Sequence, residues 1–252
     1  MDSHLTPYGI ECKTIRNILA DDEQYYGEYG KQFLSNSDIN SLINTPSEFK
    51  KPIKQTKEML LGSYFHTAIL EPNKLKNFEV VDVANRRAKT YTEACSDGVM
   101  RLLSSEKIQA DSWVDKVKNN LKMKGYIYHL DNLYEQPQVE NIMGNMWKGK
   151  ADIITNDYVI DLKTTTKIRD FDYKAKNFFY NSQAYIYQRL FNKEMLFFII
   201  DKDTLQLQIS PCSPQFIEQG KFKVEQATEQ YNKFYGKNKT HEPNDFVIEK
   251  LL

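Results

Sequence analysis

Two aspartates and a lysine stand at a spacing that could support hydrolysis of a phosphodiester bond. Asp152, Asp161 and Lys163 follow the pattern D-(x8)-D-x-K. Mg²⁺ and Mn²⁺ prefer oxygen ligands such as carboxylates, and they keep several waters that a substrate phosphate can displace. An ammonium group beside such ions could orient the attacking water. These residues therefore predict a catalytic site for one or two Mg²⁺ or Mn²⁺ ions; the alternative is a polar hairpin without chemistry.

The surrounding sequence predicts a β-hairpin that would bring these residues together. Residues 147–154 and 158–163 are short runs rich in apolar and β-branched side chains, separated by a polar turn. Side chains two apart in a strand share a face, so Asp161 and Lys163 should point the same way. Asp152 ends the first strand and can lie beside Asp161 across the ladder. We therefore expect both carboxylates and the amine to form one patch.

Two helical regions would add polar side chains to this patch. Residues 168–191 have the length of one broken or two short helices, in which Gln183 and Tyr187, four apart, share a face. His66 lies in an upstream segment that we expect to be a helix ending before Pro72. Each side chain also has an ordinary explanation. His66 could be a core or surface histidine, Gln183 a solvated helix residue, and Tyr187 part of an aromatic core stripe.

The order of these motifs resembles that of a known nuclease superfamily. Gly-x-x-x-His, Asp, Asp-x-Lys and Gln-x-x-x-Tyr follow one another here as in the RecB-like branch of the PD-(D/E)xK superfamily, with Ala151 in the usual proline position. Three longer blocks are similar to those of the exodeoxyribonuclease VIII (RecE-type) exonucleases of phages and prophages: residues 41–50, 61–72 and 161–166. The resemblance spans residues 35–236. It implies an α/β fold with the restriction-endonuclease-like core, a central mixed β-sheet flanked by α-helices.

The same resemblance implies roles for individual residues. The metal ligands would be His66, Asp152, Asp161 and, through its carbonyl oxygen, Leu162. Lys163 would position or activate water, and Gln183 and Tyr187 would contact that lysine, a water or the DNA backbone. Together with the two aspartates, these three side chains are the expected catalytic residues. Glu135 falls near a strand glutamate that the family often has, in a strand that Pro137 marks as an edge or bulged one.

The resemblance also implies an activity and a setting. Such enzymes degrade one strand of linear double-stranded DNA from its 5′ end and leave a 3′ overhang for a single-strand annealing protein. They close into ring-shaped homo-oligomers around the DNA and belong to phage or prophage recombination modules, which places them in the bacterial host cytoplasm. Two alternatives stay open: an endonuclease built on the same core, and a catalytically silent DNA-binding module.

Composition indicates where DNA could bind. A chain of 252 residues with 40% hydrophobic content can build one sizeable core, and we expect a loosely attached N-terminal arm at residues 1–34 and a single nuclease domain at residues 35–252. The formal net charge is +0, so DNA must be held by a local patch. Our candidates for contacts with DNA phosphates are Lys148, Lys150, Arg86 and Arg87. A solvated surface explains each of them as well.

The cysteines and the hydropathy pattern argue against several classes of protein. Cys12, Cys95 and Cys212 are widely separated, which predicts reduced thiols rather than a disulfide framework or a zinc site. An iron–sulfur cluster needs four thiolates, so none is expected. The sequence shows neither an apolar signal segment nor a run long enough to span a membrane. We therefore expect a cytoplasmic protein without a membrane partner.

The remaining elements are expected to be scaffold. An edge strand at residues 134–139 should precede the hairpin, and a second hairpin at residues 195–210 should extend the sheet. Helices are expected at residues 104–125 and 215–235, and a further helix should start at Asp38 with Ser35 or Ser37 as its cap.

Overall fold

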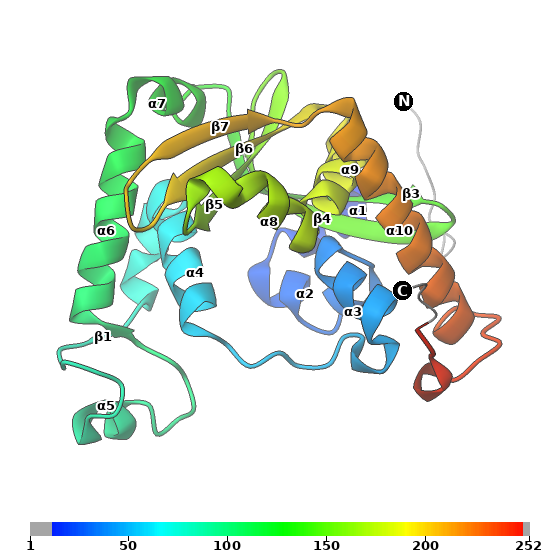
Figure 1. Cartoon of the computed structure of the whole chain (residues 1–252), viewed down its shortest axis with the longest axis horizontal. Helices are drawn as coiled ribbons and strands as arrows, with labels where there is room; N and C mark the ends of the chain where they lie inside the picture. Colours follow the sequence, from blue (N-terminus) through cyan, green and yellow to red (C-terminus); the bar gives the residue numbers. More distant parts are fainter. Residues whose placement is uncertain (1–11, 249–252) are drawn as a thin grey trace.

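A five-stranded mixed sheet forms the centre of the structure, a computed structural model that describes residues 12–248 (Figure 1). The strands lie in the order β3 (Leu133–Ile142), β4 (Asn145–Ile154), β5 (Tyr158–Thr165), β6 (Glu194–Asp201) and β7 (Leu207–Pro211). Neighbouring strands are antiparallel except β5 and β6, which are parallel. The predicted α/β fold with a central mixed sheet is confirmed.

Helices cover both faces of this sheet (Figure 1). One face packs against α4 (Lys57–Leu70), α6 (Ser104–Asn119) and α7 (Leu121–Ile127). The other packs against α3 (Ile39–Asn44), α8 (Phe171–Asn177), α9 (Tyr180–Phe191) and α10 (Pro214–Phe234). The segment between α4 and α6 holds α5 (Lys89–Ala94) and a two-stranded parallel sheet, β1 (Val80–Val81) and β2 (Leu102–Leu103).

The sequence of β6 explains why the sheet is covered on both sides. Its side chains alternate between the two apolar layers, because successive residues of a strand point to opposite faces. Leu196, Phe198 and Ile200 pack with the helices α4 and α6. The residues between them pack with α9 and α10: Met195, Phe197 and Ile199. A strand that is apolar at every one of these positions therefore occupies the interior of the sheet.

Most scaffold elements form where the sequence predicts them. The two hairpins are β4–β5 and β6–β7, and β3 is an edge strand. The expected helix at residues 104–125 is divided into α6 and α7 at Asn120, whose side chain accepts a hydrogen bond of 3.0 Å from the Met123 N–H and caps α7. Before α3 lies a 3₁₀ turn, η2 (Asn36–Asp38), where the Ser35 N–H donates to the Asp38 carboxylate at 2.8 Å.

The described part of the segment that we expect to be an N-terminal arm packs against the central sheet. The first helix, α1 (Cys12–Leu19), packs against β3, and the short helix α2 (Asp22–Tyr26) follows it. They contribute to a third apolar cluster formed by Ile15, Leu19, Tyr25, Phe33 and Val139. Because Val139 belongs to β3, this segment covers the edge of the central sheet; residues 1–11 lie outside the described part of the chain.

Between residues 12 and 248, the structure contains no helix whose length and apolar character would let it cross a membrane.

Candidate active site

The two predicted aspartates lie where the paired part of β4 and β5 ends. Ile153 pairs with Ile160, and Asp152 and Asp161 are the next residues on the two strands. The Leu162 N–H donates a hydrogen bond of 2.7 Å to Asp152 Oδ2, which ties the first carboxylate to the second strand. The structure therefore brings both carboxylates to one place at the end of the hairpin ladder.

Lys163 completes this group from the same face of β5 as Asp161. Its Nζ lies 2.7 Å from Asp161 Oδ2 and 4.4 Å from the centre of the Tyr180 ring. Burial lowers the pKa of Lys163, but the Asp161 carboxylate outweighs burial, and the pKa is raised overall. Lys163 is therefore a cation at neutral pH, which can donate hydrogen bonds but cannot accept a proton.

One oxygen of Asp161 is buried without a hydrogen bond. Gln183 Nε2 donates to Asp161 Oδ1 at 2.6 Å, whereas Oδ2, although close to Lys163, receives no hydrogen bond of suitable angle. Burial raises the pKa of Asp161, and the charge of Asp152 adds to this against the opposing charge of Lys163. A carboxylate oxygen in this condition is suited to a cation bound beside it.

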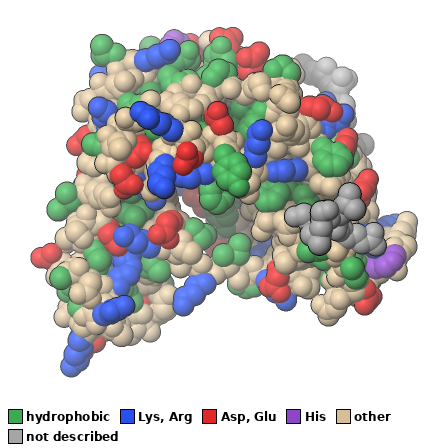
Figure 2. All heavy atoms as spheres, in the orientation of Figure 1, with side chains coloured by type: hydrophobic (Ala, Val, Ile, Leu, Met, Phe, Trp, Pro, Cys, Tyr) green, Lys and Arg blue, Asp and Glu red, His purple; other side chains and the backbone are tan. Residues whose placement is uncertain are grey.

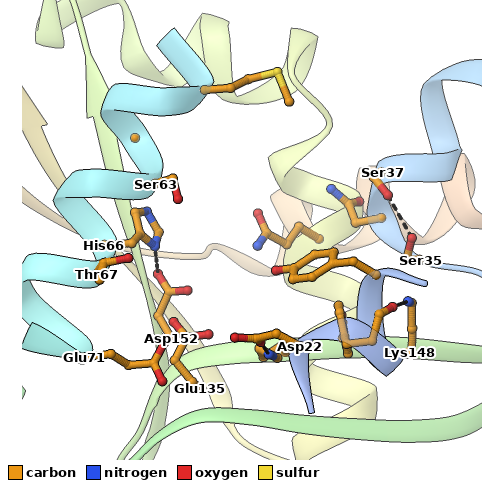
Figure 3. Close-up of a pocket in the computed structure, with 18 of the residues that line it drawn as sticks. Asp22, Ser35, Ser37, Ser63, His66, Thr67, Glu71, Glu135, Lys148 and Asp152 are labelled. Atoms are coloured by element: carbon orange, nitrogen blue, oxygen red, sulfur yellow. Dashed lines mark hydrogen bonds and ion pairs between the residues drawn. The ribbon is translucent and has the colours of Figure 1, made fainter. Parts of the chain in front are cut away.

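His66 approaches the carboxylates from α4. Its Nδ1 lies 3.1 Å from Asp152 Oδ2, and about a third of its side chain, 30%, is exposed to the cleft described below (Figure 3). Burial opposes protonation of His66, but the charges of Asp152 and Asp161 outweigh it and raise the pKa to about 9. His66 is thus paired with a site carboxylate rather than enclosed in the apolar core.

Helix α9 presents Gln183 and Tyr187 to the two strands, since residues four apart share a face. While Gln183 contacts Asp161, the Tyr187 hydroxyl donates a hydrogen bond of 2.9 Å to the Lys150 carbonyl. The helix can approach β4 this closely because residue 149 is glycine: a Cβ there would lie 2.7 Å from the Tyr187 ring. Tyr187 also belongs to the apolar cluster of this face, so it serves both packing and the geometry of the site.

A third carboxylate, that of Glu135, lies opposite Asp152 on the neighbouring strand (Figure 3). Tyr134 and Gln136 pair with Ile153 and Ala151, but Glu135 between them has a left-handed backbone with φ of 50° and interrupts the ladder. Burial and the charge of Asp152 raise the pKa of Glu135 to about 8. Three adjacent strands therefore carry carboxylates at one level.

A cleft with a volume of about 840 Å³ is lined by His66, Glu135, Asp152, Lys163, Gln183 and Tyr187. Asp161 contacts two of these residues, Lys163 and Gln183. Figure 2 shows the hollow, which opens between α4 and the segment with α2 and α3. Sequence reasoning missed three charged residues of its lining: Asp22, Glu71 and Lys74. Asp22 lies in a helix too short to give a periodic signal, and the other two flank Pro72 at the end of α4, where a polar turn is the ordinary expectation.

The donor set fits a hard divalent ion that is completed by water and substrate. Within residues 12–248, no three side chains of His, Cys, Asp or Glu are gathered into a ready-made ligand cluster. Mg²⁺ is usually held by one or two carboxylates together with waters and phosphate oxygens, rather than by a cage of side chains. Asp161 Oδ2, which receives no hydrogen bond, offers such a partial set together with Asp152 and His66.

The predicted DNA contacts fall into two groups. Lys148 and Lys150 line the cleft, but their amines already have partners: the Tyr25 carbonyl for Lys148 and the Asp22 carboxylate for Lys150. The structure does not bring the arginines to the cleft. Arg86 donates to both carboxylate oxygens of Glu106 at 2.9 and 3.0 Å, and the exposed Arg87 lies in the same segment.

The mixed sheet, the carboxylates of β4 and β5 and the adjacent lysine define a domain of the PD-(D/E)xK class. The chain belongs to the family described as a PDDEXK-like domain of unknown function (DUF3799), which matches residues 31–245.

A solved structure shares this fold. A crystal structure described as a "Putative exonuclease" from Eubacterium rectale has a TM-score of 0.66 and 16% sequence identity, covering 92% of this chain and 95% of that chain. A second structure, that of SSO0001, has 16% sequence identity to this chain and a TM-score of 0.27. The match covers 66% of this chain and 86% of that chain. A search of curated proteins found no match.

Proposed function

We propose that the protein is a metal-dependent nuclease that hydrolyses phosphodiester bonds of DNA. One observation carries this proposal: Asp152 and Lys163 line a cleft, and Asp161, which is paired with Lys163, has one oxygen that receives no hydrogen bond. A divalent ion, when bound, would activate water and offset the charge that develops on the phosphate.

The residues of the chain have separable tasks in this proposal. Asp152, Asp161 and neutral His66 would hold one or two Mg²⁺ or Mn²⁺ ions, with the Leu162 carbonyl as a further oxygen donor. Lys163, a cation with a raised pKa, would donate a hydrogen bond to the attacking water or to a phosphate oxygen. Gln183 holds the Asp161 carboxylate in place through its 2.6 Å hydrogen bond.

We propose further that the enzyme is an exonuclease that degrades one strand from the 5′ end. The ordered motifs that resemble those of RecE-type exonucleases support this, as does the description of the structurally similar Eubacterium rectale protein as a "Putative exonuclease". The 3′ overhang left behind would serve a single-strand annealing protein in recombination. A ring-shaped homo-oligomer around the DNA belongs to the same proposal, and sedimentation of the purified protein tests it.

Digestion of two DNA substrates tests this function. One is a linear duplex with a single blocked 5′ end, the other a closed circle, and each is incubated with Mg²⁺ or with EDTA. We expect Mg²⁺-dependent loss of the unblocked strand and an intact circle. Nicking of the circle would instead identify an endonuclease, and no cleavage of either substrate would identify a silent binding module.

A further inference from the structure

A carboxylate from the N-terminal segment joins two lysines inside the cleft. Asp22 Oδ2 lies 2.8 Å from Lys74 Nζ, and Asp22 Oδ1 accepts a hydrogen bond from Lys150 Nζ. Lys74 belongs to the 3₁₀ segment η4 (Pro72–Asn77) that follows α4, whereas Lys150 belongs to β4. Both lysines and Asp22 line the same cleft as His66. Three segments distant in sequence therefore meet at one ionic contact.

The two lysines differ in their need for this partner. Lys150 is 8% exposed, and the only carboxylate paired with its amine in the described part of the chain is that of Asp22. A buried ammonium without a counter-charge is costly, so this position requires an anion. Lys74 is nearly half exposed and has a second partner, Glu71 Oε1, at 2.7 Å.

Asp22 occupies the position where a phosphate would fit. Each of its oxygens receives one ammonium group, and the two non-bridging oxygens of a phosphodiester can receive two lysines in the same way. Partial burial would raise the pKa of Asp22, but hydrogen bonds from Lys150 and Lys74 outweigh it, and the pKa is lowered. The carboxylate is therefore an anion under the conditions in which DNA is bound.

We propose that Lys74 and Lys150 form a binding subsite for a DNA phosphate, and that the Asp22 carboxylate fills it until DNA displaces it. This inference rests on the proposed nuclease function. It names the residues that take one phosphate of the strand in the cleft, and it assigns Asp22 as an internal competitor.

Displacement requires movement of only one side chain. Asp22 is in the first turn of α2, and 48% of its side chain is exposed. Within α2 only Tyr25 is buried, and it can stay in place while the Asp22 side chain turns to solvent. Glu23, the next residue, is also exposed but does not line the cleft. It provides a control with the same charge on the same helix turn.

Equilibrium binding of a fluorescent duplex in EDTA, where the proposed hydrolysis stops, tests the subsite. We expect Asp22→Asn to bind the duplex about 3- to 10-fold more tightly than wild type at low salt, because an ion pair of this exposure corresponds to roughly 1 kcal/mol. Glu23→Gln should stay within about twofold of wild type, which separates the local effect from the change in net charge. Equal affinities of the two variants would overturn the proposal.

A double-mutant cycle supplies the second measurement. Lys74→Gln should weaken binding and lower the slope of log Kd against log salt by about one. In that background, the gain from Asp22→Asn should shrink to less than half, because the two residues act at one phosphate. An undiminished gain would refute the shared subsite. If wild type and all variants fail to bind DNA, the proposed function fails as well, whereas binding by wild type without these differences overturns the subsite alone.

Discussion

At the scale of single residues, the site places two carboxylates of like charge next to each other in a buried position. Asp161 is buried beside Asp152 and its pKa is raised, because burial and the like charge outweigh the opposing charge of Lys163. Such a carboxylate costs stability when it is ionised, and a bound cation would relieve that cost. The ionised Asp161 carboxylate therefore does not stabilise the metal-free fold.

Asp161→Asn separates activity from stability. We expect DNA cleavage to fall at least about 100-fold, in line with the loss of one charged group from a preorganised site. The melting temperature of the metal-free variant at pH 7 should stay close to that of wild type, because relief of the buried Asp161 charge is offset by loss of the counter-charge of Lys163. Nuclease assays and thermal unfolding check the two parts. Full activity would contradict our placement of the site.

His66 should couple metal binding to proton release. Its pKa is raised to about 9, so the imidazole is protonated at pH 7, and it must lose that proton to bind a metal. Mg²⁺ or Mn²⁺ affinity should therefore increase as pH rises toward 9.

In the metal-free protein the same pKa shift means that the His66–Asp152 pair contributes its full stability below pH 6.5 and loses it as pH passes about 9.

Calorimetry in two buffers of different ionisation enthalpy measures the protons released. Because Glu135 also has a pKa of about 8, the comparison with His66→Gln is the informative one. Wild type should release about one proton more per bound ion than this variant. Identical proton release by the two proteins would show that His66 is not a ligand.

At the scale of elements, the distance between α9 and β4 determines the geometry of the site. Gly149 leaves no room for a side chain, since a Cβ would lie 2.7 Å from both the Tyr187 ring and Leu190 Cδ1. The helix that carries Gln183 can therefore approach the strand that carries Asp152.

Gly149→Ala should push α9 away from β4. We expect a loss of about 1–3 kcal/mol of unfolding free energy from overpacking, together with reduced cleavage. Gly125→Ala is the matched control: Gly125 lies in α7, and a Cβ added there would meet open space out to 4 Å, so alanine should stabilise by about 0.5–1 kcal/mol. Urea unfolding of both variants measures the difference, and equal stabilities would contradict the close approach.

Short-range periodicity in the sequence is enough to predict part of this site. The two-residue period of a strand places Asp161 and Lys163 on one face, and the four-residue spacing places Gln183 and Tyr187 on one helix face. Periodicity does not predict the position of the Glu135 side chain, because the left-handed backbone of this residue interrupts β3. In the sequence, only Pro137 indicates that the strand is irregular there.

The contacts that sequence could not predict are long-range and polar. Asp22 and Lys150 are separated by 128 positions, and neither residue belongs to a pattern that indicates the other. β4 also changes face at Asp152: Ala151 packs beneath α9, whereas Ile153 packs beneath α4. The contacts of Ala151 and Ile153 depend on which helix covers each face of the sheet. Residues far away in the chain set that arrangement.

At the scale of the whole molecule, the N-terminal segment packs against the central sheet. Lys148 Nζ donates to the Tyr25 carbonyl and lies 4.0 Å from the centre of the Tyr25 ring. Residues on both sides of the expected boundary near residue 34 share one apolar cluster within the described part of the chain. The segment closes one side of the cleft.

Two neighbouring tyrosines allow this attachment to be measured. Tyr25 is 8% exposed and Tyr26 is 69% exposed. Tyr25→Ala should lower the unfolding free energy by about 3 kcal/mol, as for other buried aromatic side chains, whereas Tyr26→Ala should change it by less than about 1 kcal/mol. Chemical denaturation of the two variants is the test. Similar small effects would mean that the segment contributes little to the fold.

The packing of α1 and α2 against β3 has a consequence for synthesis on the ribosome. The chain emerges from its N-terminus, so Ile15, Leu19 and Tyr25 are made long before Val139 and Lys148, the partners that cover them. Throughout that interval the nascent chain carries an uncovered apolar segment, a target for chaperones that bind exposed hydrophobic residues. The cleft is closed on this side only after β4 has been translated.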